Sequence, residues 1–241
     1  MRAETRHHLK QDAFSRATIG AAEKTAHWSV EHQNTLLLAG AVVVLALGVG
    51  LGGWYYQSSQ NEKASFDMSL AVRTLDTPIR PAGSPPQPEM PSFVSTRERA
   101  DTASKQLQAI LDKYPHTRTA DMARYLLGVT SAAKGDNSAA ERNFKDVASS
   151  GSRELASVAK LALAGLYGNT KRTKDAVALY QELINKPTTA VSKVTAQLQL
   201  AELYQTSNQP LDAKRLYEQV KKDNPSTEAG QLATQKLSEL K

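Results

Sequence analysis

The sequence predicts an all-α protein: a single transmembrane helix, then an α-solenoid of about three to four helix pairs and a C-terminal capping helix. Three observations support this fold class. Residues 36–53 form a stretch without any charged or strongly polar side chain. Beyond it, apolar residues recur at three- or four-residue steps, which is the period of a helix rather than of a strand. A pattern of small, aromatic and aliphatic residues is then repeated at offsets of 36 and 37 residues.

The composition excludes several classes of function. The chain has 241 residues, a formal net charge of +6 and no cysteine. The absence of cysteine excludes a disulfide framework, a thiolate nucleophile, a cysteine-bound zinc and a lipid-modified cysteine anchor. Residues 57–241 mix 25 Lys and Arg with 20 Asp and Glu, so the basic surplus is small. The densest basic cluster, 171–174, falls in a predicted turn without an aromatic platform, and we therefore expect no nucleic-acid partner.

Residues 35–56 have the length and composition of a transmembrane helix. At about 1.5 Å per residue, the apolar stretch and the triplet Trp54-Tyr55-Tyr56 together reach roughly 30 Å, the thickness of a bilayer's hydrocarbon core. The triplet suits the headgroup level, and it stands where a cleaved signal peptide needs small residues. The preceding tail, residues 1–34, is too long for the n-region of a signal peptide. We therefore expect an uncleaved anchor in the lipid bilayer.

The charges on the two sides of this segment predict its orientation. Five Lys or Arg lie in the tail, whereas Lys63 and Arg73 are the nearest cations on the other side. By the positive-inside rule, the tail is expected in the cytoplasm and residues 57–241 outside it. Reversed insertion is the alternative. Gly48 and Gly52 stand four residues apart, a spacing that favours a homodimer of membrane helices, although glycine is common in such helices anyway.

A helical segment and a proline-rich linker precede the repeats. Residues 57–76 continue the helical apolar period, and residues 77–95 contain six of the ten prolines. This composition favours an extended linker with polyproline II tendency. The alternative is that the proline-rich segment is a ligand for another domain. A further helix is predicted over residues 96–113. We expect the helices on either side of the linker to be the two halves of an opened-up first repeat.

Residues 96–225 contain the internal repeat. Alignment of Ala140, Ala176 and Ala213 places a ring four positions after each alanine and an aliphatic residue three positions further on. We interpret each alanine as the point where the second helix of a pair approaches the first. The rings that we expect in the core are Phe144, Tyr180, Tyr204 and Tyr217. Because each pair leaves an apolar face unfinished, the pairs should stack as a solenoid, with residues 226–241 as the capping helix.

This pattern resembles the tetratricopeptide repeat. The resemblance is carried by Leu-Gly or Leu-Ala pairs at 127–128, 163–164 and 200–201 and by tyrosines at 167 and 204. Its best-matching stretch is 135–144, Gly-Asp-Asn-Ser-Ala-Ala-Glu-Arg-Asn-Phe. The aromatic residue that usually opens the motif is missing, and the copies are slightly longer than usual. In such solenoids the first helix of every pair lines the concave side.

The repeat register predicts a protein-binding groove on that concave side. The residues expected to line it are Met122, Tyr125, Val129, Leu161, Gly165, Leu198, Glu202 and Gln205. Apolar residues with a polar rim suit an extended or helical peptide segment as ligand. Packing between repeats is the alternative interpretation for each of these residues.

The sequence offers no converging set of catalytic or metal-binding residues. His116 is the single histidine beyond the membrane segment, and it lies in a predicted turn. With no cysteine and no acid pair nearby, it provides neither a metal site nor a base for a nucleophile. No phosphate loop, nucleotide fingerprint or hydrolase motif is present. We therefore predict no enzymatic activity, no cofactor and no metal.

The order of tail, single transmembrane helix and repeat ectodomain resembles the YfgM-like family of bacterial inner-membrane proteins. The resemblance implies an ancillary subunit of the SecYEG translocon whose repeats lie in the periplasm. Such a subunit works beside a membrane-anchored chaperone and contacts newly exported chains. The proline-rich linker departs from the plain family pattern. A scaffold for another cell-envelope assembly, such as outer-membrane or cell-wall machinery, is the alternative, and a hydrolase or regulator in the cytoplasm is a third hypothesis.

Overall fold

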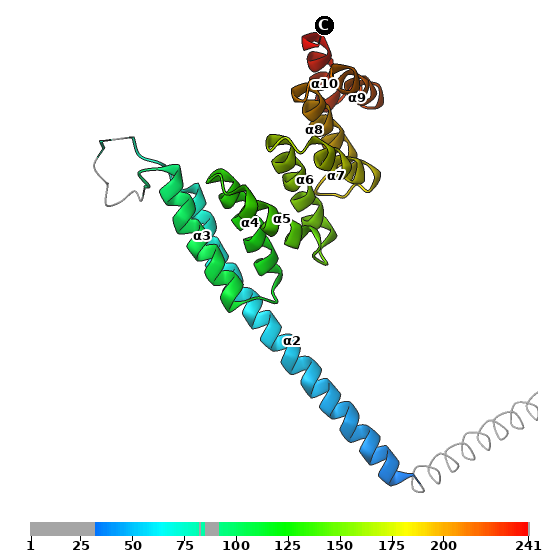
Figure 1. Cartoon of the computed structure of the whole chain (residues 1–241). Coiled ribbons are helices and arrows are strands. Elements are labelled where there is room, and N and C mark those ends of the chain that lie inside the picture. Colours follow the sequence, from blue (N-terminus) through cyan, green and yellow to red (C-terminus); the bar gives the residue numbers. More distant parts are fainter. Residues whose placement is uncertain (1–31, 82, 85–91, 241) are drawn as a thin grey trace, which may run out of the picture. The chain divides into compact units, whose positions relative to one another are not determined.

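The computed structural model describes residues 32–81, 83–84 and 92–240, so most of the predicted cytoplasmic tail lies outside the described residues. The described chain is almost entirely helical (Figure 1). Its helices are α2 (Gln33–Asp76), α3 (Thr96–Lys113), α4 (Arg118–Ala133), α5 (Asn137–Ala148), α6 (Arg153–Asn169), α7 (Thr173–Asn185), α8 (Lys193–Thr206), α9 (Pro210–Asp223) and α10 (Glu228–Glu239). The all-α prediction is confirmed.

The chain divides into two units, and the boundary between Ser58 and Ser59 falls inside α2. The described part of the first unit is essentially the apolar part of α2. Its large side chains, from Leu37 to Tyr56, are exposed, and in the described part of the chain α2 is the one helix long and apolar enough to cross a membrane. A surface of this kind is stable in lipid rather than in water, because burying it in the bilayer removes apolar area from water.

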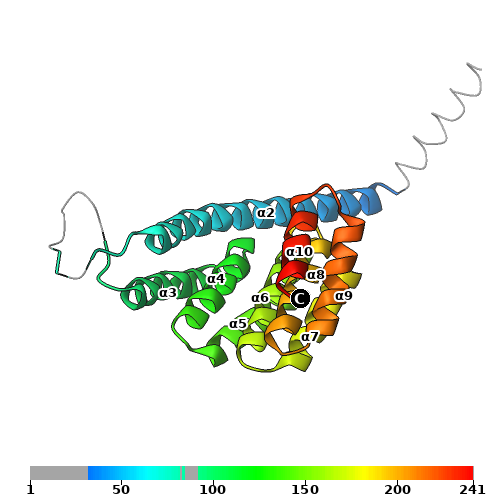
Figure 2. The same cartoon turned by 90° about the horizontal axis from the view of Figure 1, so that it is seen from above.

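The second unit is a stack of helix pairs. Each helix from α3 to α10 contacts the next one along the chain. The hairpins follow one another in chain order, with α10 at the end in Figure 1, and Figure 2 shows the same stack from above. The pairs are α4 with α5, α6 with α7, and α8 with α9. Ala140, Ala176 and Ala213 are fully buried on the second helix of these pairs. This burial agrees with the predicted close approach of the two helices.

The rings that follow these alanines fill the core. Phe144, Tyr180 and Tyr217 are each at most 3% exposed, as expected, whereas Tyr204 is only half-buried between two apolar clusters. The contact of Phe144 with α4 is especially close. A Cβ atom placed on Gly128 would lie 2.5 Å from Cε1 of Phe144. The glycine of the Leu-Gly motif is therefore required because the ring packs directly on the helix backbone.

The C-terminal part of α2, from Ser59, pairs with α3. Ala71 is buried in a cluster with Leu107 and Ile110 of α3, and the cluster extends to α4. The hydroxyl of Tyr114 also donates a hydrogen bond to Asp67 at 3.3 Å. These contacts close the first pair, even though its two helices are separated by the proline-rich segment.

The two ends of that segment are joined. Ile79 and Phe93 form an isolated parallel β-bridge, in which the amide of Arg80 donates to the carbonyl of Phe93 at 2.9 Å. The amide of Phe93 in turn donates to the carbonyl of Pro78 at 3.1 Å. The two ends of the predicted linker thus lie side by side, because α2 and α3 form a hairpin. Its extended character stays a prediction, since residues 82 and 85–91 lie outside the described residues.

Candidate protein-binding groove

The residues predicted on α4 lie on its exposed side. Met122 is 43% exposed and Val129 is 39% exposed, and their seven-residue spacing places them two turns apart on one face. Tyr125 is half-buried: its ring centroid lies 5.8 Å from that of Phe144, and burial raises its pKa. The α4 part of the predicted groove therefore has two accessible apolar side chains and one aromatic ring that packs partly between the helices.

The residues predicted on α6 and α8 fall into two groups. Leu161 and Leu198 are half-buried and pack against the apolar clusters of the solenoid, and Gln205 accepts a hydrogen bond from the hydroxyl of Tyr217 at 3.3 Å. Gly165 and Glu202, in contrast, line the same cavity of about 700 Å³. The structure thus brings Gly165 and Glu202 together and directs the other three toward internal packing. A protein-binding role for the eight residues stays a prediction.

The cavity shared by Gly165 and Glu202 lies between α6 and α8. Other residues that line it include Gly168, Asn169, Lys171, Tyr180, Gln199 and Leu203. A Cβ atom on Gly165 would meet nothing within 4 Å, so this wall of the cavity is bare helix backbone. The side chains around it supply amides, a carboxylate and an ammonium group, which can donate to and accept from the backbone of a polypeptide.

Tyr180 forms part of the lining of this cavity. Its side chain is 3% exposed, yet its hydroxyl makes no hydrogen bond with any described residue. Burial and the negative charge of Glu202 raise the pKa of Tyr180 to about 12, which keeps the phenol protonated. Because Tyr180 borders the cavity, its hydroxyl is open to a hydrogen-bond acceptor that enters there. Tyr180 is therefore a donor ready for a carbonyl or carboxylate oxygen.

The sequence interpretation assigned Tyr180 to the core and did not select the amides of Asn169 and Gln199. Tyr180 is buried as expected, but it also borders the cavity. The spacing of Gly165 and Gly168 is a signal that was available, since two glycines three residues apart leave one face of α6 without side chains.

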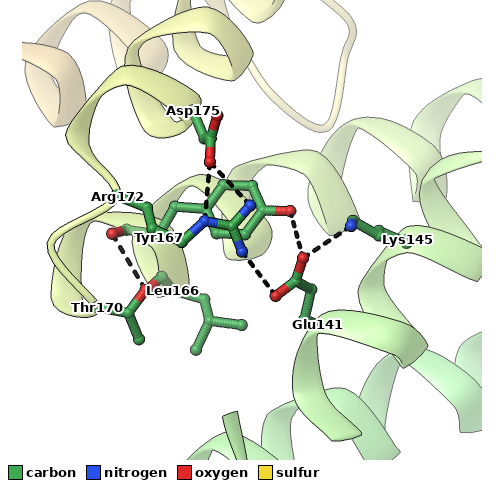
Figure 3. A network of polar contacts seen from close by, with 7 residues as sticks. All are labelled: Glu141, Lys145, Leu166, Tyr167, Thr170, Arg172 and Asp175. Atoms are coloured by element: carbon green, nitrogen blue, oxygen red, sulfur yellow. Dashed lines mark hydrogen bonds and ion pairs between the residues drawn. The ribbon is translucent and has the colours of Figure 1, made fainter. Parts of the chain in front are cut away.

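A polar network next to the groove joins successive helix pairs (Figure 3). Glu141 of α5 accepts hydrogen bonds from the Tyr167 hydroxyl at 2.9 Å and from Arg172 Nη1 at 2.8 Å, and its Oε1 pairs with Lys145 at 2.7 Å. These donors, with Lys145 the strongest, lower the pKa of Glu141 to about 2. The guanidinium of Arg172 also pairs with Asp175 at 2.8 Å.

This network also includes Arg172 of the basic cluster at 171–174. The guanidinium carbon of Arg172 lies 3.9 Å from the ring centroid of Tyr167, which is buried and therefore offers no surface on which a base could stack. The sequence could not show this contact, because Tyr167 belongs to the helix before the turn. Arg172 is thus engaged by a ring and two carboxylates of its own chain.

Within the described ranges, no group of three or more His, Asp or Glu side chains lies close enough together to hold a metal ion. His7 and His8 fall outside those ranges.

Comparisons with known proteins identify the repeat. A family model described as a tetratricopeptide repeat-like domain matches residues 26–182, and a tetratricopeptide repeat model matches residues 195–227. A crystal structure of a tetratricopeptide repeat protein from Parabacteroides merdae superimposes with a TM-score of 0.52 at 15% sequence identity. The match covers 74% of this chain and 60% of that protein, less than two thirds of its length, and it shows the fold. A search of curated proteins returned no significant match.

Proposed function

This chain belongs to the tetratricopeptide repeat-like domain family, and from that premise we propose that it is a membrane-anchored adaptor for other proteins. It binds polypeptides in the cavity between α6 and α8 that Gly165 and Glu202 line, which we call the cleft. Repeats of this family are protein-interaction scaffolds. The observation that carries the proposal is the hydroxyl of Tyr180, which borders the cleft, is protonated and makes no hydrogen bond with any described residue. An extended segment laid across Gly165 presents backbone carbonyls that can accept a hydrogen bond from this donor.

We further propose that the adaptor is a single-pass protein of the bacterial inner membrane with its repeats in the periplasm. The apolar part of α2 and the charge difference across it support this placement. Its partners would then be the SecYEG translocon, a membrane-anchored chaperone and exported chains, as the resemblance to the YfgM-like family implies. Gly48 and Gly52 carry no neighbour within 4 Å and are open to a second copy of the helix.

Site-specific photocrosslinking in cells tests the binding site. A photoreactive residue at Gln199 in the cleft, or at Met122 on α4, should capture translocon subunits, the chaperone or exported chains. The matched control is the exposed Lys214 on α9, which lines neither the cleft nor α4. Equal capture from Lys214, or capture of cytoplasmic proteins alone, would contradict the proposal.

The absence of cysteine makes the topology directly testable. A single cysteine introduced by Lys214→Cys should react with a membrane-impermeant maleimide in intact cells whose outer membrane has been permeabilised. Reaction only after lysis of the inner membrane would place the repeats in the cytoplasm and overturn the periplasmic assignment. The proposed peptide cleft would survive that result, because it does not depend on the compartment.

A further inference from the structure

A second cavity, of about 640 Å³, lies among α3, α4 and α5, away from the groove residues of α4. Its floor contains Leu127 and Ser131. Each of these stands two residues from Val129, and two residues turn a helix by roughly 200°. The cavity therefore opens on a side of α4 different from the one that carries Met122 and Val129.

The charges around this cavity are mostly positive. Lys105 projects from α3, Arg142 from α5, and Lys134 follows the end of α4. Lys134 pairs with Asp101 at 3.0 Å, so this acidic group of the lining is already neutralised. Lys105 and Arg142 make no ion pair within the described residues. Two uncompensated cations thus stand on α3 and α5, the two helices that flank α4.

The floor supplies a hydrogen-bonding group. Ser131 is 7% exposed, and its hydroxyl makes no hydrogen bond with the described part of the chain. This hydroxyl faces the cavity and can donate a hydrogen bond to an acceptor oxygen of an occupant. The guanidinium of Arg142 presents a planar fork that suits a carboxylate, and Lys105 provides a point charge on the facing helix.

We propose that this cavity binds an acidic polypeptide segment of a partner protein, with one carboxylate between Lys105 and Arg142. The charge complementarity selects the occupant, and the Ser131 hydroxyl can donate to one of its oxygens. The family to which the chain belongs binds polypeptides, which favours aspartate or glutamate side chains over a lipid phosphate. The site does not depend on the cleft between α6 and α8, because the two share no lining residue.

The test uses the full chain in neutral-detergent micelles and a fluorescein-labelled peptide of alternating Glu and Ser residues. Fluorescence anisotropy should show binding that weakens as salt is raised, because the exposed charges are screened. Lys105→Gln and Arg142→Gln should each lower the affinity about fivefold, since each removes one charge-assisted contact. The control variant Lys214→Gln, on α9, should bind as the unmodified chain does. Circular dichroism checks that each variant keeps its helices.

Three results would overturn the proposal. The first is equal binding of a Gln-Ser peptide by the unmodified chain. The second is no binding of the acidic peptide, or affinity unchanged in both variants. The third is binding of short-chain phosphatidylglycerol, seen by native mass spectrometry, that depends on Arg142 while the peptide does not bind. Photocrosslinking at Gln199 is independent of all three, so failure here leaves the proposed cleft untouched.

Discussion

Arg172 stacks on Tyr167 at 3.9 Å, and the same two side chains converge on Glu141 of the preceding helix pair. The ring holds the guanidinium in place, and the guanidinium bonds to a carboxylate of α5 and to Asp175 of α7. One arginine in a turn thereby links two successive repeats. Neighbouring repeats in a solenoid are held by such contacts in addition to apolar burial.

Removal of the Tyr167 hydroxyl should weaken this link. Tyr167→Phe keeps the ring beneath Arg172 but removes the 2.9 Å hydrogen bond to Glu141. We expect the free energy of unfolding to fall by about 1 kcal/mol, measured from urea denaturation. Tyr180→Phe is the matched control, because its hydroxyl donates to no described residue. A loss as large in Tyr180→Phe as in Tyr167→Phe would contradict the assignment.

The control variant Tyr180→Phe should also separate the effect of this hydroxyl on binding from any effect on stability. Tyr180→Phe leaves the fold unchanged, but it removes the donor that we assign to a bound polypeptide. Photocrosslinks from Gln199 should therefore become weaker by about fivefold, the loss expected for one buried hydrogen bond. Undiminished crosslinking in Tyr180→Phe would show that ligands do not use this hydroxyl.

The pKa of Glu141 predicts a pH dependence of stability. The pKa is about 2 in the folded protein, against an ordinary value of 4.5. Because the folded pKa is the lower one, the stabilisation is complete above about pH 4.5 and is lost as the pH falls toward 2. Solvent reaches a quarter of the side chain, so screening reduces the effect to about 1 to 2 kcal/mol.

Glu141→Gln isolates this contribution. The variant should be less stable than the unmodified chain at neutral pH, and the difference in free energy of unfolding should shrink below pH 4.5. Urea denaturation at several pH values measures it. A difference that is constant over the acid range would mean that the Glu141 charge does not stabilise the fold.

Two glycine-to-alanine changes should have opposite effects. In Gly128→Ala the new methyl group meets the buried ring of Phe144, so we expect a loss of about 1 to 3 kcal/mol. In Gly165→Ala the methyl group enters open space, and the higher helix propensity of alanine should stabilise α6 by about 0.5 to 1 kcal/mol. Thermal unfolding of the two variants compares them directly, and a shift of the same sign in both would refute the packing argument.

The local pattern of the sequence was sufficient to predict the helices and much of the core. The predicted helix over 96–113 coincides with α3, and the rings at Phe144, Tyr180 and Tyr217 are buried as their repeat positions implied. The helical period of the apolar residues indicates which face of a segment is buried, and each segment carries that information in its own residues. A bilayer-length apolar stretch is similarly a local property.

The partner of each polar side chain was not predictable in this way. Tyr167 and Arg172 contact Glu141 across 26 and 31 residues of sequence, and the hydroxyl of Ser131 opens into a cavity bordered by Lys105 and Arg142. The sequence by itself thus determined the helices, their repeat and their buried faces. Only the tertiary structure decided which donors remained free and where the cavities lie. The reason is that stacking brings together residues from different pairs, and the short period of a single helix does not encode their separation.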